Sequence, residues 1–337
     1  MSNAEKIDFV IIWVDGNDPQ WQEQRAKYSP QKNQDGSAGR YRDWNNLKYW
    51  FRGVEKFAPW VNNVYFITCG QVPDWLNLNH PKLKFVKHED FIPSDCLPTF
   101  SSRAIDLNFH RISELSEHFV YFNDDMFLLD RVKPEDFFVN GLPCDMFCEY
   151  PLSFSGKTYV FSHTMVNNLT MIGKHFKRQE VKKRLRSKML NPAYGTFFFY
   201  NLIMYCLPFP NNIGVLSHHC PLPTLKSSYE ELWKEEPEIL NDTIHNRFRT
   251  ITDVNQFVFR YWSLFQGKFV PKNILKMGKM YQAGKETCKR ICRVIEKQEK
   301  KMICINDDCE ASDFENVRDE IIRSFEVLFP DKSGFEK

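Results

Sequence analysis

The sequence predicts an α/β fold built on an open, mainly parallel sheet, with helical additions in the C-terminal half. Up to about residue 150, apolar segments of strand length alternate with segments of helical periodicity, and each apolar segment ends in polar residues. The first of these segments, residues 7–14 (IDFVIIWV), ends in Asp15-Gly16, which is typical of a buried parallel strand.

The remaining elements follow from the same patterns. Apolar positions at helical spacing predict helices over residues 45–57 and 103–117, and short apolar runs predict strands over residues 64–68, 83–86 and 119–122. The polar residues 17–41, which include Gly36 and Gly39, are expected to form a long mobile loop. Beyond residue 150 the pattern is helical and irregular.

Open parallel sheets bind their ligands outside the carboxyl ends of the strands. Asp15, Gln71 and the pair Asp124-Asp125 each follow a predicted strand closely. We therefore expect these side chains to converge on one crevice, although they lie far apart in the sequence.

The composition excludes several classes of protein. The 337 residues carry a formal net charge of +2, which gives no sign of a nucleic-acid partner, and we expect none. The longest apolar run, residues 197–210, is shorter than the roughly 20 residues that a membrane span needs, so we expect it to be buried and no segment to cross a membrane. Ten cysteines without a secretory leader favour a cytoplasmic protein with free thiols.

Two patterns allow more than one interpretation. Cys144/Cys148 and Cys288/Cys292 have a spacing that could turn two thiols of one helix toward a metal, but no CxxC pair accompanies them, and we expect ordinary thiols. Residues 174–188 contain eight Lys/Arg against one Glu, and residues 276–301 contain nine against three. We favour solvated helix faces, with contact to an anionic acceptor, lipid headgroups or a polyanionic glycan as the alternative.

The acidic turn after residues 119–122 is the first candidate site. Adjacent carboxylates at a strand end, as in Asn123-Asp124-Asp125, suit a hard cation such as Mg²⁺ that also takes phosphate oxygens, although an isolated motif of this kind is usually a surface turn. Asn306-Asp307-Asp308 is a second acidic turn. Gly16, next to Asp15, would let a ligand approach the backbone.

Basic side chains provide the complementary groups. His219, or His218 beside it, offers an imidazole that titrates near neutral pH. Arg247 and Arg249 offer guanidinium groups that match phosphate oxygens, unless they are solvated on a helix face. From the residues alone, we expect an α/β enzyme that binds a metal and a phosphorylated ligand.

Four segments resemble, in order, the four signature regions of the Stealth proteins. The first is IDFVIIWVDGNDPQW (7–21), and the second comprises RYRDWNNLKYWFRGVEKFAPWVNNVYFITCGQVPDWLN (40–77), LPTFSSRAIDLNFHRI (97–112) and FVYFNDDMFLL (119–129). The third is SHHCPLPTLKSSYEELWKE (217–235) with NRFRTITDVNQF (246–257), and residues 302–337 resemble the fourth. These segments cover more than half of the chain.

The resemblance implies a Rossmann-like nucleotide-sugar transferase core. The family includes bacterial capsule and exopolysaccharide phosphotransferases and the animal N-acetylglucosamine-1-phosphotransferase, which use a nucleotide-sugar, usually a UDP-hexose, with Mg²⁺ or Mn²⁺. They join the sugar to a saccharide or polysaccharide acceptor through a phosphodiester and release UMP. The alternatives are a metal-dependent glycosyltransferase that attacks the anomeric carbon and releases UDP, and an inactive glycan-binding relative.

The family motifs carry over onto residues of this chain. Asp125 and Asp307 would hold the metal, Arg249 would bind phosphate oxygens, and either His219 or Asp124 would accept the proton of the acceptor hydroxyl. We expect Asp15, Gly16 and Gln71 to contact the nucleotide-sugar. Trp44 and Lys226 depart from the residues of many members at positions that could touch the substrate, so the identity of the sugar stays open.

We expect the chain to form a single catalytic unit. Residues 1–150 would bind the nucleotide-sugar and the metal, residues 151–300 would contact the acceptor and the phosphate, and residues 301–337 would return to the active site. A cytoplasmic location is expected, with peripheral contact at the inner face of the membrane left open.

Overall fold

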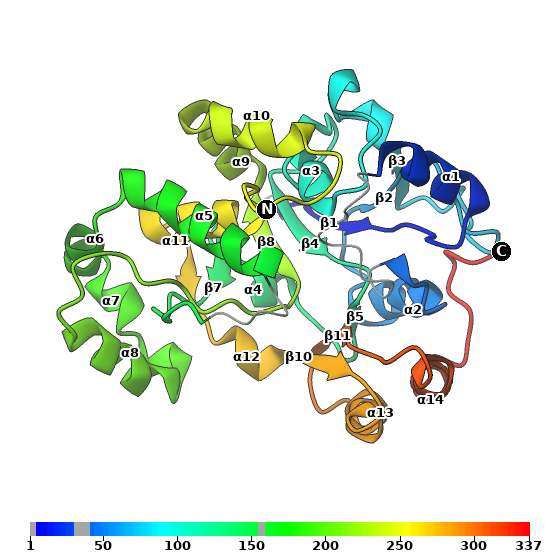
Figure 1. Ribbon diagram of the computed structural model, residues 1–337. Helices are drawn as coiled ribbons and strands as arrows, with labels where there is room; N and C mark the ends of the chain where they lie inside the picture. Colours follow the sequence, from blue (N-terminus) through cyan, green and yellow to red (C-terminus); the bar gives the residue numbers. More distant parts are fainter. Residues whose placement is uncertain (1–4, 30–40, 154–158) are drawn as a thin grey trace.

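The computed structural model describes residues 5–29, 41–153 and 159–337, and an open five-stranded sheet lies at its centre (Figure 1). The strands β1 (Ile7–Ile12), β2 (Val64–Thr68), β3 (Leu83–Lys87), β4 (His118–Phe122) and β8 (Leu222–Leu225) are arranged in the order β3-β2-β1-β4-β8. The first four are parallel, and β8 runs antiparallel to β4. The predicted α/β fold with an open, mainly parallel sheet is confirmed.

Both faces of this sheet are covered, as the apolar sequences of the strands predict. Side chains alternate along β1, so that Phe9 and Ile11 belong to one apolar cluster and Val10 to another. Trp50 of α2 (Leu47–Phe57) packs into the first cluster, and Tyr229 of α9 (Lys226–Glu235) packs into the second together with much of α11 (Phe257–Gln266).

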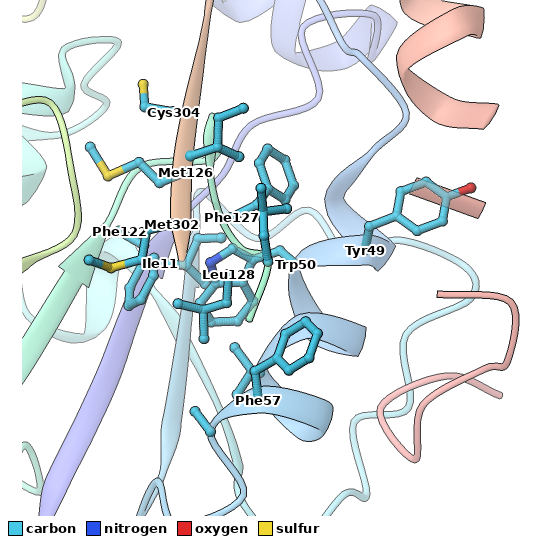
Figure 2. Close-up of a cluster of buried hydrophobic side chains, with 14 of the residues drawn as sticks. Ile11, Tyr49, Trp50, Phe57, Phe122, Met126, Phe127, Leu128, Met302 and Cys304 are labelled. Atoms are coloured by element: carbon cyan, nitrogen blue, oxygen red, sulfur yellow. The ribbon is translucent and has the colours of Figure 1, made fainter. Parts of the chain in front are cut away.

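A smaller sheet in the order β10-β11-β5 joins the C-terminal part of the chain to the acidic turn after β4. It consists of β5 (Met126–Leu128), β10 (Gly278–Ala283) and β11 (Met302–Asp307), and β5 is antiparallel to β11. Figure 2 shows Met126 and Met302 in one apolar cluster with Phe122 at the end of β4. The Ile305 N–H donates to the Asp125 carbonyl oxygen at 2.8 Å, so β11 lies directly beside the acidic turn.

The other elements surround these sheets (Figure 1). A third sheet has the order β6-β7-β9, with β6 at Phe138–Val139, β7 at Leu142–Asp145 and β9 at Val270–Pro271. The remaining helices are α1 (Pro19–Tyr28), α3 (Ser102–Asp106), α4 (Pro134–Phe137), α5 (Tyr159–His175), α6 (Arg178–Arg184), α7 (Arg186–Met189), α8 (Phe197–Cys206), α10 (Pro237–His245), α12 (Ile274–Met277), α13 (Cys288–Glu296) and α14 (Phe314–Leu328).

The loop expected over residues 17–41 is wrong in its first part, which forms α1. Asp18 is the N-cap, since its Oδ1 accepts hydrogen bonds from the backbone N–H groups of Gln20 (2.9 Å) and Trp21 (3.4 Å), and Pro19 occupies the first helical position. Gly36 and Gly39 lie outside the described residues.

The long helix expected over residues 103–117 is also wrong. It is replaced by the short helix α3 and a 3₁₀ turn over Phe109–Arg111. The Asn108 Nδ2 donates to the Ala104 carbonyl oxygen at 2.7 Å, and the backbone N–H of Asn108 would bind this same oxygen in a continued α-helix. The side chain therefore competes with the helical hydrogen bond.

The apolar run over residues 197–210 is not buried as expected. It forms α8, on which Phe199 and Ile203 remain 66% and 61% exposed. Across the described ranges, none of the helices combines the length and apolar character needed to cross a bilayer.

All ten cysteines are free thiols, as expected. Cys144 lies in β7 and Cys148 follows that strand, so these two thiols do not share a helix face. Cys288 and Cys292 do share α13, where their Sγ atoms are 3.9 Å apart and Glu320 Oε2 lies 3.3 Å from Cys288 Sγ.

Candidate active site

A cleft of about 1130 Å³ opens beyond the carboxyl ends of β1 and β4. Five of the side chains predicted from the sequence line it, namely Asp124, Asp125, His219, Arg249 and Asp307. They come from the end of β4, the segment before β8, the loop before α11 and the end of β11, so the fold brings together residues that are up to 183 positions apart, from 124 to 307.

Asp124 is open to the cleft, but the cleft walls surround its carboxylate on most sides. This limited solvation raises the pKa of Asp124 to about 7, and the neighbouring charges of Asp125 and, to a smaller degree, Asp43 act in the same direction.

Asp125 lies between a histidine and a cysteine. Its Oδ2 accepts a hydrogen bond from Cys304 Sγ (3.2 Å) and lies 3.9 Å from His219 Nε2. Burial, with the nearby Asp125 charge, raises the pKa of the Cys304 thiol well above its usual range, so this group remains protonated and donates. Asp125 Oδ1 is buried and accepts no hydrogen bond from the described residues.

Asp307 faces an arginine that the sequence analysis missed. Arg42 Nη1 lies 3.7 Å from Asp307 Oδ2, and its guanidinium is 4.3 Å from the ring centroid of Phe314. Asp307 Oδ1 accepts the backbone N–H of Cys309 at 2.9 Å, whereas Oδ2 is buried and accepts no hydrogen bond within the described ranges. The compact cluster of possible metal ligands contains Asp125, His219 and Cys304, with Asp307 on the same cleft but outside that cluster.

The two adjacent histidines have different partners. His218 is buried, and its Nε2 lies 3.3 Å from Oδ1 of Asp145, which also receives two hydrogen bonds from Arg260, at 2.7 and 2.9 Å. Burial and the Arg260 charge lower the pKa of His218, so it is a neutral structural group. His219 is 28% exposed, lines the cleft and approaches Asp125.

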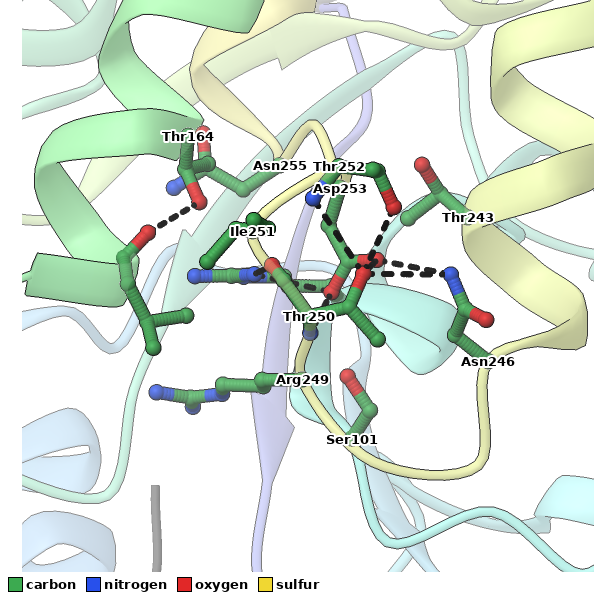
Figure 3. A network of polar contacts seen from close by, with 12 residues as sticks. Ser101, Thr164, Thr243, Asn246, Arg249, Thr250, Ile251, Thr252, Asp253 and Asn255 are labelled. Atoms are coloured by element: carbon green, nitrogen blue, oxygen red, sulfur yellow. Dashed lines mark hydrogen bonds and ion pairs between the residues drawn. The ribbon is translucent and has the colours of Figure 1, made fainter. Parts of the chain in front are cut away.

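Arg249 lies in a loop that is held by hydrogen bonds to the Asp253 carboxylate (Figure 3). The Asp253 carboxylate accepts hydrogen bonds from Arg103 Nη1 (2.8 Å), the Thr250 N–H (2.8 Å) and Asn246 Nδ2 (2.9 Å). Figure 3 shows the Arg249 side chain directed away from this network, and its Nη2 donates to Ser102 Oγ at 2.6 Å. The guanidinium is half-buried on the cleft wall, where it can bind an anion.

Asp15 and Gly16 lie in the loop after β1, and Gln71 lies in the loop after β2. None of the three is among the residues that line the cleft, so Asp15 and Gln71 do not join Asp124 and Asp125 there as expected. Gln71 Oε1 accepts the Asp15 N–H at 2.9 Å, and its Nε2 donates to Asp18 Oδ2 at 2.8 Å. A Cβ on Gly16 would lie 1.9 Å from the Tyr41 carbonyl oxygen, so a glycine is needed for close packing here. The expected contact of these three residues with the nucleotide-sugar stays a prediction.

Asp43 is a second residue that the sequence analysis missed. It lines the cleft, and burial, with a smaller contribution from the charge of Asp15, raises its pKa. Its signal was its place beside Trp44 in the second signature region. Trp44 lines the cleft, whereas Lys226 does not, because its Nζ donates to the carbonyl oxygens of Ile112 (2.8 Å) and Ser113 (3.3 Å).

Comparisons with known proteins support the resemblance seen in the sequence. Models of the Stealth protein conserved regions 1, 2 and 4 match residues 5–33, 40–144 and 293–337. The capsular polysaccharide phosphotransferase WcwK of Streptococcus pneumoniae is 41% identical over 340 residues, with 100% of both chains covered. The exopolysaccharide phosphotransferase cps2G of Lactiplantibacillus plantarum is 40% identical, with 98% of this chain and 96% of the relative covered.

The solved structure of the galactosyltransferase LgtC with donor and acceptor sugar analogues covers 94% of this chain and 95% of its own chain. Its TM-score of 0.37 and 11% identity are too low to support a conclusion about function. The match to the capsular phosphotransferase, by contrast, covers the full length of the chain and therefore also the segments that line the cleft. The chain therefore belongs to the Stealth family, together with the bacterial polysaccharide phosphotransferases.

Proposed function

We propose that the chain transfers a hexose 1-phosphate from a UDP-sugar, such as UDP-N-acetylglucosamine, to a saccharide hydroxyl in capsule or exopolysaccharide synthesis, and releases UMP. The observation that carries this proposal is the 41% identity along the whole length to a capsular polysaccharide phosphotransferase. The cleft supports it, because its lining combines carboxylates that suit a cation with an arginine and a histidine that suit a phosphate.

In the proposed reaction the acceptor oxygen attacks the β-phosphorus in line with the pyrophosphate bridge. The new O–P bond forms while the bridging P–O bond breaks, UMP leaves, and the anomeric C–O bond stays intact. Arg249 binds the equatorial phosphate oxygens, because positioning and charge stabilisation dominate phosphoryl transfer. His219 or Asp124 accepts the hydroxyl proton.

A divalent cation fits the acidic side of the cleft. Asp125 Oδ1 and Asp307 Oδ2 are buried acceptors without a hydrogen-bond donor in the described chain. Limited solvation, together with the neighbouring Asp125 charge, raises the pKa of Asp124. We propose that Asp125 and Asp307 hold Mg²⁺ or Mn²⁺, with Asp124 beside them. When bound, the cation would offset charge on the phosphate oxygens.

The bond that breaks identifies the reaction. The protein should be incubated with UDP-, GDP- and CDP-sugars, a saccharide acceptor and Mn²⁺, and the nucleotide products separated by chromatography. UMP and a phosphodiester signal in the ³¹P spectrum of the product are expected. Release of UDP with a phosphorus-free linkage would instead identify a glycosyltransferase, and consumption of no donor would favour the glycan-binding alternative.

Variants test the assigned residues. His219→Ala should lower the rate by at least about 10²-fold, the low end of general-base catalysis, and Asp125→Asn should abolish turnover. His245→Ala, at an exposed histidine outside the cleft, is the matched control and should leave the rate unchanged. Equal effects at the two histidines would remove His219 from the chemistry.

A further inference from the structure

The outer face of α8 is apolar, which is the reverse of an ordinary surface helix. Phe199, Leu202, Ile203 and Leu207 are 66%, 40%, 61% and 37% exposed, and their spacing places them on one stripe of the helix. The inner face carries Asn201, whose Nδ2 donates to the carbonyl oxygens of Phe147 and Met189, both at 2.9 Å. Beside Asn201 the inner face buries Met204, so α8 is apolar on its outer face as well as on its inner one.

The packing of the protein interior does not require apolar side chains at these exposed positions. Soluble proteins rarely leave a row of large apolar side chains on one helix face, and a row of this kind marks an interaction site. On α14, by comparison, Val327 is 69% exposed, but it is a single apolar residue beside Glu326 on a largely charged outer face. The α8 stripe therefore indicates a partner that accepts apolar side chains.

The charge around the stripe indicates the nature of that partner. Residues 181–229 contain no aspartate or glutamate. Near the C-terminal end of α8, Lys182 Nζ of α6 lies 4.6 Å from the ring centroid of Tyr205, and the next residue, Lys183, is exposed. Near the N-terminal end, the exposed Lys276 reaches Gly195 just before the helix. Lysines thus lie close to both ends of the apolar stripe.

The basic segment over residues 174–188 has two roles. Arg178 is buried and pairs with Glu149 at 2.6 and 2.7 Å, and Lys188 Nζ donates to the carbonyl oxygens of Gly267 and Phe269, so these two groups serve the fold. Lys183 and Arg186 remain exposed beside α8. Part of this segment is therefore available to an anionic surface.

We propose that α8 and its flanking lysines form a docking surface for an anionic lipid bilayer, with the helix lying in the plane of the headgroups. Interfacial helices bury their apolar face at the acyl boundary, and basic side chains beside them bind anionic headgroups. A protein partner fits less well, because the cores of protein interfaces are poor in lysine. This inference does not depend on the proposed chemistry.

The docking surface adjoins the cleft. Phe197 and Tyr200 of α8 pack against a buried cluster of Met146, Cys148 and Tyr194. Leu275 packs against the same cluster and also lines the cleft. Figure 1 shows α8 next to α12, on the side of the molecule away from α13 and α14. Docking through α8 would therefore hold the cleft close to the bilayer while α13 and α14 face away from this contact.

Vesicle co-sedimentation tests the proposal with the full chain. Wild type should sediment with vesicles of phosphatidylcholine and phosphatidylglycerol, bind pure phosphatidylcholine more weakly, and lose the preference for phosphatidylglycerol as salt is raised. Phe199→Ser combined with Ile203→Ser should weaken binding by at least about tenfold, since two large apolar side chains no longer enter the lipid. Val327→Ser, at an equally exposed apolar residue of α14, should bind like wild type.

Two charge-reversal double variants test the contribution of the lysines to binding. Lys182→Glu combined with Lys276→Glu should remove the preference for phosphatidylglycerol, whereas Lys289→Glu combined with Lys297→Glu, at exposed positions on and beside α13, should not. Thermal melting establishes that each variant is folded. The proposal would be overturned if wild type did not sediment with anionic vesicles at low salt, or if the Phe199/Ile203 variant bound them as strongly as wild type. A wild-type dimer in light scattering that this variant converts to a monomer would assign the stripe to self-association instead.

Discussion

Replacing Arg260 by methionine should unfold the protein more easily, because it leaves a carboxylate without its cation in the interior. Arg260 Nε and Nη2 donate to the two Asp145 oxygens at 2.7 and 2.9 Å, and the side chains are only 1% and 7% exposed. Methionine keeps the apolar stem of the arginine but supplies neither the charge nor the two hydrogen bonds.

The expected cost follows from the surroundings of Asp145. Removing one partner of a buried ion pair costs about 3–5 kcal/mol. The Asp145 Oδ1 still accepts the Met146 N–H at 2.6 Å and keeps His218 at 3.3 Å, so we expect a value near the lower end of that range. On the surface, Arg290 pairs with Glu299 at 2.6 Å but is 50% exposed, and Arg290→Met should cost much less stability.

Urea unfolding, followed by tryptophan fluorescence at pH 7, measures both variants. Asp145→Asn in the Arg260→Met background should recover part of the lost stability, because it removes the unpaired charge. If Arg260→Met costs no more than Arg290→Met, the buried pair does not stabilise the native state as reasoned here.

Three further outcomes are expected. Burial lowers the pKa of His88 and His110 to about 4, so between about pH 6.5 and 4 the unfolded chain binds protons that the native chain does not. The urea midpoint of unfolding should therefore fall as pH drops from about 6.5 to 4. It should fall less steeply in a His88→Gln/His110→Gln variant. A cation held by Asp125 and Asp307 favours the charged form of the neighbouring Asp124, so Mn²⁺ affinity measured by calorimetry should rise as pH increases through about 7, and a flat profile would contradict this. Gly16→Ala should lower the melting temperature, because its Cβ would lie 1.9 Å from a carbonyl oxygen, whereas Gly284→Ala, with 3.9 Å to its nearest neighbour, should not.

The central sheet could be predicted because its signals are local. The runs at residues 64–68 and 119–122 correspond to β2 and β4 almost residue for residue, and the rule that ligands bind at the carboxyl ends of parallel strands correctly placed Asp124 and Asp125 on the cleft. The helix α1 was not predicted, although Asp18-Pro19 is a good start signal, because its polar sequence resembles that of a loop.

The partners of the site residues could not be predicted, since they depend on long-range pairing. Cys304 meets Asp125 only because β5, a strand of three residues, pairs with β11 far along the chain. Arg42 and Asp307 likewise come from opposite ends of the sequence. No periodicity or spacing within either segment encodes such contacts.

The acidic side of the cleft is costly to the protein that carries it. Limited solvation and nearby carboxylates disfavour the charged forms of Asp124 and Asp43, and this raises the pKa of both groups. Asp125 Oδ1 and Asp307 Oδ2 are buried without a hydrogen-bond donor among the described residues. Asparagine would relieve this cost and still offer an oxygen to the Cys304 thiol and to the Cys309 N–H. Residues that break the local rules of stability are expected where function needs them. A cation arriving with a phosphorylated ligand would supply the missing positive charge, so the same carboxylates that weaken the free protein would stabilise its complex.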